Sequence, residues 1–93
     1  MMYLVAYDIP NNRRRGRLAD ALLAFGSRVQ ESVFECDLQA KDELHAMLTH
    51  IQREISPSDG DCVRVYRLCA DCLTRTIIFG AGQIAADPDL III

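Results

Sequence analysis

The stretch YLVAYDIPNNRRRGRLADAL, residues 3–22, decides the fold of this chain. Its β-rich beginning, residues 2–8, has apolar side chains on both parities, which is typical of a strand inside a sheet. Pro10 and the asparagines that follow end this strand, and Asn12 is the predicted N-cap of a helix. The helix should run to about Phe25 with Leu18 and Leu22 on its apolar face, and Gly26 is predicted as its C′ residue.

The rest of the chain continues the alternation of strand and helix. Residues 27–38, SRVQESVFECDL, predict one bent strand or a very tight hairpin. Apolar residues at helical spacing predict a second helix over residues 40–55, followed by the loop 56–61. Strands are expected at residues 62–68, at 75–79 and in the terminal LIII, residues 90–93.

This β-α-β(β)-α-β order, with two short strands appended, predicts a ferredoxin-like α+β sandwich formed by one domain over residues 1–93. The four apolar residues at the C-terminus would be exposed in a monomer. We therefore expect residues 75–93 to form an appended strand segment that pairs with a partner subunit.

Composition also indicates a subunit interface. Hydrophobic residues make up 51% of 93 residues, and the mean hydropathy is +0.09. A domain of this size leaves much of its surface in water, so the apolar surplus favours a C2 homodimer over an unusually apolar monomer.

The charge of the chain is unevenly distributed. A net charge of −3 and a pI of about 5.2 argue against a general nucleic-acid-binding protein. Half of the ten basic residues nevertheless lie within a short stretch: Arg13, Arg14, Arg15, Arg17 and Arg28. Cations at a helix N-terminus oppose the helix dipole, and a bound phosphate would offset that repulsion. The alternative is a solvated basic face in which Asp20 pairs with Arg17.

Asp8 stands at the end of the first strand, where a carboxylate can hold the hard cation that phosphodiester hydrolysis uses. The alternative is that Asp8 only begins the turn toward the helix. Cys69 and Cys72 form a C-x-x-C motif, but a structural zinc site needs four ligands, so we interpret them as ordinary turn or core thiols. His45 and His50 are expected on the solvated side of the second helix.

The apolar runs of the chain are too short for a membrane span, and MMYLVAY at the N-terminus lacks the basic region of a signal peptide. We therefore expect a cytoplasmic protein with reduced cysteines and no membrane partner.

Taken together, the stretch from Tyr3 to Leu38, then VRVYRLCADC, IIFGAG and the apolar terminus, resembles the small CRISPR-associated protein of the spacer-acquisition machinery, often described as an endoribonuclease. The most specific parts are YDI at residues 7–9 and RVQESVFE at residues 28–35. Glu31 departs from many members, which have an uncharged residue there. A carboxylate near a nucleic-acid groove would repel phosphate.

The resemblance implies a ferredoxin-like homodimer in which Asp8 of each subunit faces its twin and the pair holds a divalent metal, usually Mg²⁺. It assigns Asp8 and Tyr7 to catalysis. It also implies that Arg15, Arg17, Arg28, Ser32 and Phe34 serve nuclease activity, and Arg13 joins them as a phosphate contact through its place in the cluster.

Two functions follow from the resemblance. One is metal-dependent cleavage of single-stranded RNA or double-stranded DNA at the dimer interface. The other is a non-catalytic subunit that bridges copies of the CRISPR integrase and holds DNA. A small-molecule-binding regulatory domain is a third possibility, which the clustered arginines disfavour.

Overall fold

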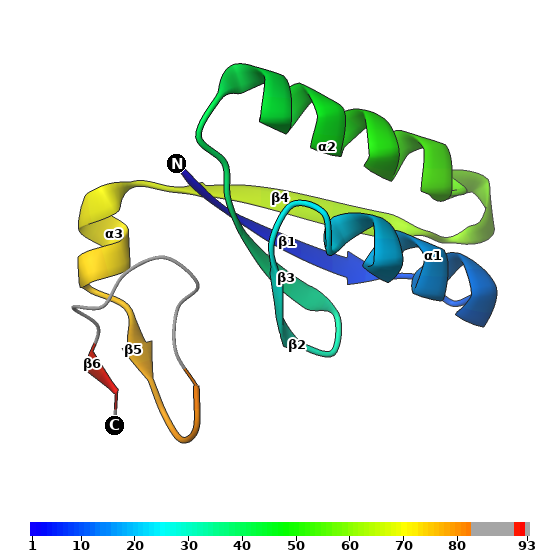
Figure 1. Ribbon diagram of the computed structural model, residues 1–93. Helices are drawn as coiled ribbons and strands as arrows, with labels where there is room; N and C mark the ends of the chain where they lie inside the picture. The colour runs from blue at the N-terminus through cyan, green and yellow to red at the C-terminus, as the bar shows by residue number, and fades with distance from the viewer. Residues whose placement is uncertain (83–90, 93) are drawn as a thin grey trace.

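The computed structural model describes residues 1–82 and 91–92 and confirms the ferredoxin-like α+β fold. Four strands form one antiparallel sheet in the order β2-β3-β1-β4: β1 (Met2–Asp8), β2 (Ser27–Gln30), β3 (Val33–Asp37) and β4 (Cys62–Leu68). The helices α1 (Asn12–Leu22) and α2 (Lys41–Glu54) pack on the same face of this sheet (Figure 1).

The core lies between the helices and one face of the sheet. Val5 and Phe34 from the sheet are fully buried against Leu18, Leu22 and Met47 from the helices. Because side chains alternate along a strand, the neighbours Leu4, Ala6 and Asp8 project to the face that α1 and α2 leave uncovered.

The start of α1 corrects one prediction. The N-cap is Asn11 and not Asn12, because the Asn11 side chain accepts a 2.9 Å hydrogen bond from the Arg14 N–H. Asn12 is the first helical residue.

The end of α1 corrects another. The helix ends at Leu22, and turns carry the chain through Phe25. Gly26 is not needed there for a positive φ, since within residues 1–82 and 91–92 only Gly60 and Gly80 have one. A Cβ on Gly26 would stand 2.2 Å from the Glu35 carbonyl oxygen, so glycine is required for close approach to β3.

Residues 27–37 form a tight hairpin, which is the second of the two structures predicted for this stretch. A turn at Glu31 and Ser32 joins β2 to β3, and the register shifts between Arg28 and Gln30. The second helix occupies Lys41–Glu54, close to its predicted bounds, and the loop after it contains a 3-10 turn, Pro57–Asp59.

The chain beyond the sheet differs most from prediction. The C-x-x-C motif opens a short helix, α3 (Ala70–Thr74), and Cys69 is its N-cap. Cys69 and Cys72 are exposed, so they are not core thiols. The strands β5 (Ile77–Ile78) and β6 (Ile91–Ile92) pair in parallel within this chain. Pairing of residues 75–93 with a partner subunit stays a prediction, and residues 83–90 and 93 lie outside the described residues.

Candidate functional site

Asp8 is the last residue of β1 and is exposed to solvent. It lies opposite Cys62 of β4, while Ala6 lies opposite Arg64. Together with Tyr7, these residues line a shallow hollow of about 200 Å³. The fold therefore places Asp8 and Arg64 on the same uncovered face of the sheet, where both line one hollow.

Arg64 was not among the sequence-predicted site residues. The strand pattern of β4 could have indicated it: Arg64 and Cys62 are two residues apart, so their side chains project to the same face of the sheet as Asp8. The pairing that brings Arg64 beside residues 6–8 is set by the register between β1 and β4, which the sequence does not specify. Its guanidinium donates to the Tyr66 hydroxyl at 3.3 Å.

Tyr7 points to the opposite face from Asp8, as adjacent strand residues do. Its ring is 6% exposed and lies 6.3 Å from the ring of Phe34. Its hydroxyl donates to the Glu31 carbonyl at 3.2 Å, and its backbone N–H donates to the Ser32 carbonyl at 3.1 Å. Tyr7 thus links the end of β1 to the β2–β3 turn.

The hairpin residues gather around the same turn. Arg28 donates to the Glu31 carbonyl through Nε at 2.9 Å and through a second nitrogen. Ser32 is half-buried. Phe34 is fully buried in the core, so its side chain supports Tyr7 and has no surface to offer a nucleic acid. The exposed Glu31 contributes its carbonyl to this network.

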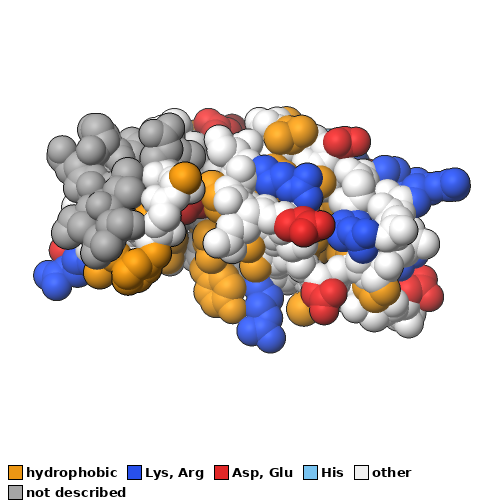
Figure 2. All heavy atoms as spheres, turned by 90° about the horizontal axis from the view of Figure 1, so that it is seen from below, with side chains coloured by type: hydrophobic (Ala, Val, Ile, Leu, Met, Phe, Trp, Pro, Cys, Tyr) orange, Lys and Arg blue, Asp and Glu red, His pale blue; other side chains and the backbone are white. Residues whose placement is uncertain are grey.

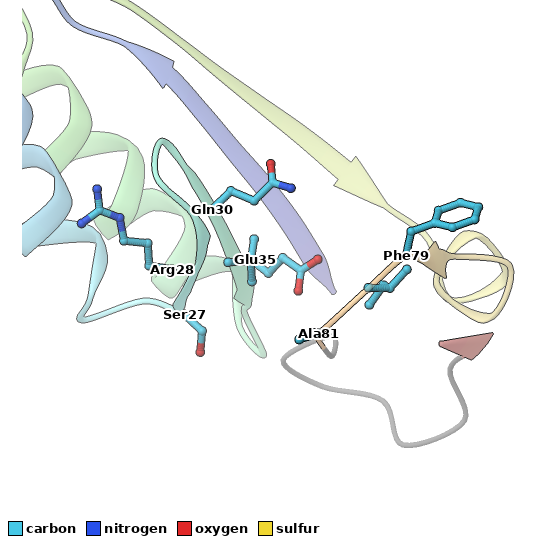
Figure 3. Close-up of a pocket in the computed structure, with 9 residues that line it drawn as sticks. Ser27, Arg28, Gln30, Glu35, Phe79 and Ala81 are labelled. Atoms are coloured by element: carbon cyan, nitrogen blue, oxygen red, sulfur yellow. The ribbon is translucent and has the colours of Figure 1, made fainter. Parts of the chain in front are cut away.

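A larger hollow of about 450 Å³ lies between the hairpin and the chain after β5. Gln30 and Glu35 extend toward Phe79, whereas the Arg28 side chain points away from it (Figure 3). Phe79 is 80% exposed. Arg28 lines this larger hollow, whereas Asp8 lines the smaller one.

The four clustered arginines of α1 differ in the groups that they contact. Arg14 forms two hydrogen bonds, of 2.8 and 3.0 Å, with the buried carboxylate of Asp61, which holds the pKa of that carboxyl below its ordinary value. Arg15 donates to the Ile9 carbonyl at 2.9 Å and also to Asn12. Both arginines fasten the helix start to its surroundings.

Arg13 and Arg17 are the exposed members of the cluster. Arg17 Nε lies 3.6 Å from Glu54 Oε2 of α2, and Asp20, the partner in the alternative interpretation, does not pair with it among the described residues. The Arg13 side chain makes no ion pair or hydrogen bond with any residue in the described part of the chain. These two side chains are available to an external phosphate.

One chain does not complete a metal site at Asp8. Among residues 1–82 and 91–92, no group of three or more His, Cys, Asp or Glu side chains could hold a metal ion. A divalent cation such as Mg²⁺ takes several oxygen ligands, of which the chain supplies one carboxylate here. The donor set fits a metal only if a second copy adds its own Asp8.

Neither histidine lies at this site. His45 and His50 are exposed on α2 as predicted, and the His50 ring lies 5.7 Å from that of Phe25. None of the described helices is long and apolar enough to cross a bilayer.

The fold and the exposed strand-end aspartate define a small ferredoxin-like protein with one exposed carboxylate at the end of β1. The family model described as CRISPR associated protein Cas2 matches residues 1–76, and the chain belongs to this family. That places it among the CRISPR adaptation proteins, as the resemblance predicted.

Similar proteins agree with this placement. A Chloroflexus aurantiacus protein named CRISPR-associated endoribonuclease Cas2 1 is 43% identical over 82 residues, which cover 88% of this chain and 87% of that protein. The Cas2 structure from Streptococcus pyogenes at pH 6.5 superposes with a TM-score of 0.71 at 30% identity, covering 82% of this chain and 95% of that one. A chain of a partial Cas6-RT-Cas1–Cas2 complex superposes with a TM-score of 0.70 at 28% identity, covering 81% and 86%.

Proposed function

We propose that this protein is a homodimeric, metal-dependent phosphodiesterase of CRISPR adaptation, which cleaves single-stranded RNA or double-stranded DNA at a site made by two Asp8 carboxylates. The observation that carries the proposal is the position of Asp8: an exposed carboxylate at the end of β1, on the uncovered sheet face, in a hollow that Arg64 also lines. The name of the Chloroflexus relative, an endoribonuclease, supports the reaction class.

The uncovered sheet face is the surface that we assign to the dimer. It presents the half-buried Leu4 and Ala6 next to Tyr66, which is 46% exposed. Seen from below, the side turned away from α2, hydrophobic side chains are interspersed with basic and acidic ones (Figure 2). A twofold axis near the end of β1 would bury the apolar groups and bring the two Asp8 side chains together.

The metal, Mg²⁺ in our proposal, would be held by the two Asp8 carboxylates and would polarise the phosphate and lower the pKa of an attacking water. Arg64 supplies a positive charge next to the substrate phosphate. Arg13 and Arg17 hold the nucleic-acid backbone through contacts that carry no sequence information.

In this proposal, the other predicted site residues position Asp8 and the backbone around it. Tyr7, Phe34 and the hairpin turn fix the backbone that presents Asp8, and Arg28 and Ser32 hold that turn in place. Arg15 fixes the segment after Asp8 by its bond to the Ile9 carbonyl. Their contribution to binding is the positioning of the surface that a nucleic acid contacts.

The test is cleavage of labelled single-stranded RNA and double-stranded DNA by purified dimer, with Mg²⁺ or with a chelator. Asp8→Asn preserves the shape of the side chain but removes the charge, so cleavage should be abolished while fold and dimer remain. Asp20→Asn is the matched control, because it removes the same charge from an exposed position on α1. Full cleavage by well-purified Asp8→Asn protein would sink the catalytic assignment.

The superposition on a chain of a Cas1–Cas2 complex favours a second function, in which the dimer bridges integrase subunits and holds DNA without cutting it. This function needs the arginines but not hydrolysis. If it is the role in cells, Asp8→Asn should still support spacer acquisition. Loss of acquisition by a folded, integrase-binding Asp8→Asn dimer would rule out a purely bridging role.

A further inference from the structure

The thiols of Cys69 and Cys72 lie in direct contact at the end of the sheet. The Cys69 Sγ donates to the Cys72 Sγ across 3.3 Å, and both side chains are exposed. The contact is built by α3: Cys69 is the N-cap of the helix, and Cys72 lies in its first turn. A disulfide requires a sulfur separation of about 2.05 Å, so a movement of roughly 1.3 Å would join them.

We propose that Cys69 and Cys72 form a reversible dithiol–disulfide couple that low-molecular-weight disulfides oxidise. The Cys69 thiolate attacks one sulfur of the oxidant, and one oxidant thiolate leaves. Cys72 then loses its proton to solvent and attacks the Cys69 sulfur, which expels the second oxidant thiolate. In total, the protein dithiol loses two electrons and two protons, and one small disulfide becomes two small thiols.

The surroundings of the two sulfurs favour Cys69 as the attacking group. Hydrogen bonds from the Cys72 backbone and side chain lower the pKa of the Cys69 thiol, and helix residue Asp71 opposes this shift with its charge. The bond with Cys69 raises the pKa of the Cys72 thiol. The thiolate is the reactive form in exchange, so the two sulfurs have different roles.

A disulfide fits this motif better than a metal does. Two thiolates are half of a structural zinc site, and among the described residues no group of three or more His, Cys, Asp or Glu side chains could hold a metal ion. A disulfide needs only the two sulfurs that already touch. The couple is also independent of the Asp8 site, because α3 begins after Leu68, which pairs with Met2 at the opposite end of β1.

The disulfide would link the end of β4 to the first turn of α3. Thr74, Arg75 and Thr76 already bond back to the Asp71–Cys72 turn of this helix. Oxidation would therefore fix the connector that carries the chain from the sheet to β5.

The experiment equilibrates full-length protein with mixtures of reduced and oxidised glutathione, followed by acid quenching, alkylation in denaturant and peptide mass spectrometry. The protein offers matched controls: Cys62 is a single exposed thiol and Cys36 is a buried one, whose pKa burial raises to about 11. We expect an intramolecular Cys69–Cys72 disulfide that forms and reverses with the glutathione ratio, while Cys36 and Cys62 are recovered alkylated. Cys62→Ser should behave as the wild type.

Single variants test the order of attack. Cys72→Ser should stop at a glutathione mixed disulfide on Cys69, and this adduct should form faster than the one on Cys72 in the Cys69→Ser variant. The proposal is overturned if the pair stays reduced throughout the series, if glutathione spreads equally over Cys62, Cys69 and Cys72, or if the disulfides form between chains. Equal adduct rates in the two variants would contradict the assignment of Cys69 as the attacking thiol.

Discussion

At the residue scale, Arg14 and Asp61 form the ion pair that joins α1 to the loop before β4. The two residues are 47 positions apart, and the Asp61 side chain is completely buried. Asp61 also accepts a 2.8 Å hydrogen bond from the Ser56 N–H. Arg14 is thus committed to the structure of the protein, although it stands in the middle of the arginine cluster.

This pair should make folding stability depend on pH. The bond from Arg14 lowers the pKa of Asp61 in the folded state, so the stabilisation is complete above the ordinary aspartate pKa of about 3.9 and is lost as the pH falls through the lowered value. Asp61→Asn should be less stable near neutral pH and should lose less stability on acidification. Urea unfolding across the acid range measures this.

Asp59→Asn is the control for that series, because Asp59 is 63% exposed and lies 3.9 Å from Arg14. It should retain the acid dependence of the wild type. An Asp61→Asn protein with the same acid dependence as wild type would contradict the assignment of the buried pair.

Only part of the candidate site could be predicted from individual residues of the sequence. Asp8 could be placed at a strand end because the β-rich run before it and Pro10 after it are local signals. The division of the arginines could not be predicted, because Asp61 and Glu54 become partners of Arg14 and Arg17 only when distant segments pack. The burial of Phe34 follows from which strand face the helices cover.

At the scale of elements, Gly26 and Gly16 are a natural pair for comparison. A Cβ on Gly26 would meet the Glu35 carbonyl oxygen at 2.2 Å, whereas a Cβ on Gly16 meets nothing within 4 Å. Gly26→Ala should destabilise the protein by about 1–3 kcal/mol, the usual cost of overpacking. Gly16→Ala, inside α1, should stabilise it by about 0.5–1 kcal/mol.

Chemical denaturation of the two variants checks this prediction. A Gly26→Ala protein as stable as the wild type would show that the contact between Gly26 and β3 is looser than described. The two substitutions add the same methyl group. If they change the free energy of unfolding in opposite directions, the difference comes from the surroundings of each backbone position and not from the residue type.

Helices and strands could be predicted where the sequence pattern that marks them extends over many residues. The α2 helix has an apolar periodicity over several turns, and its predicted bounds differ from Lys41–Glu54 by one residue at each end. The five residues of α3 are too few for such periodicity, so the C-x-x-C appeared to lie between strands. The sequence does not decide between a bent strand and a hairpin over residues 27–38, because the turn Glu31–Ser32 lacks the glycine or asparagine that usually marks a hairpin.

At the scale of the whole molecule, two parts of the chain are expected to take part in dimerisation, namely the C-terminal residues and the uncovered sheet face. We predict that residues 75–93 pair with a partner subunit, so deletion of residues 89–93 should weaken the dimer. Sedimentation across a dilution series measures the effect. Equal dimerisation at low micromolar concentration would contradict an interface role for this segment.

The sharing of one site by two chains is the central claim, and a mixed dimer tests it most directly. Wild-type and Asp8→Asn subunits with different affinity tags are coexpressed, and the mixed dimer is isolated by purification on both tags in turn. If the two Asp8 carboxylates hold one metal, the mixed dimer should cleave as poorly as the double Asp8→Asn dimer. A mixed dimer that keeps half of the wild-type rate would show that each Asp8 works alone, and would contradict the account.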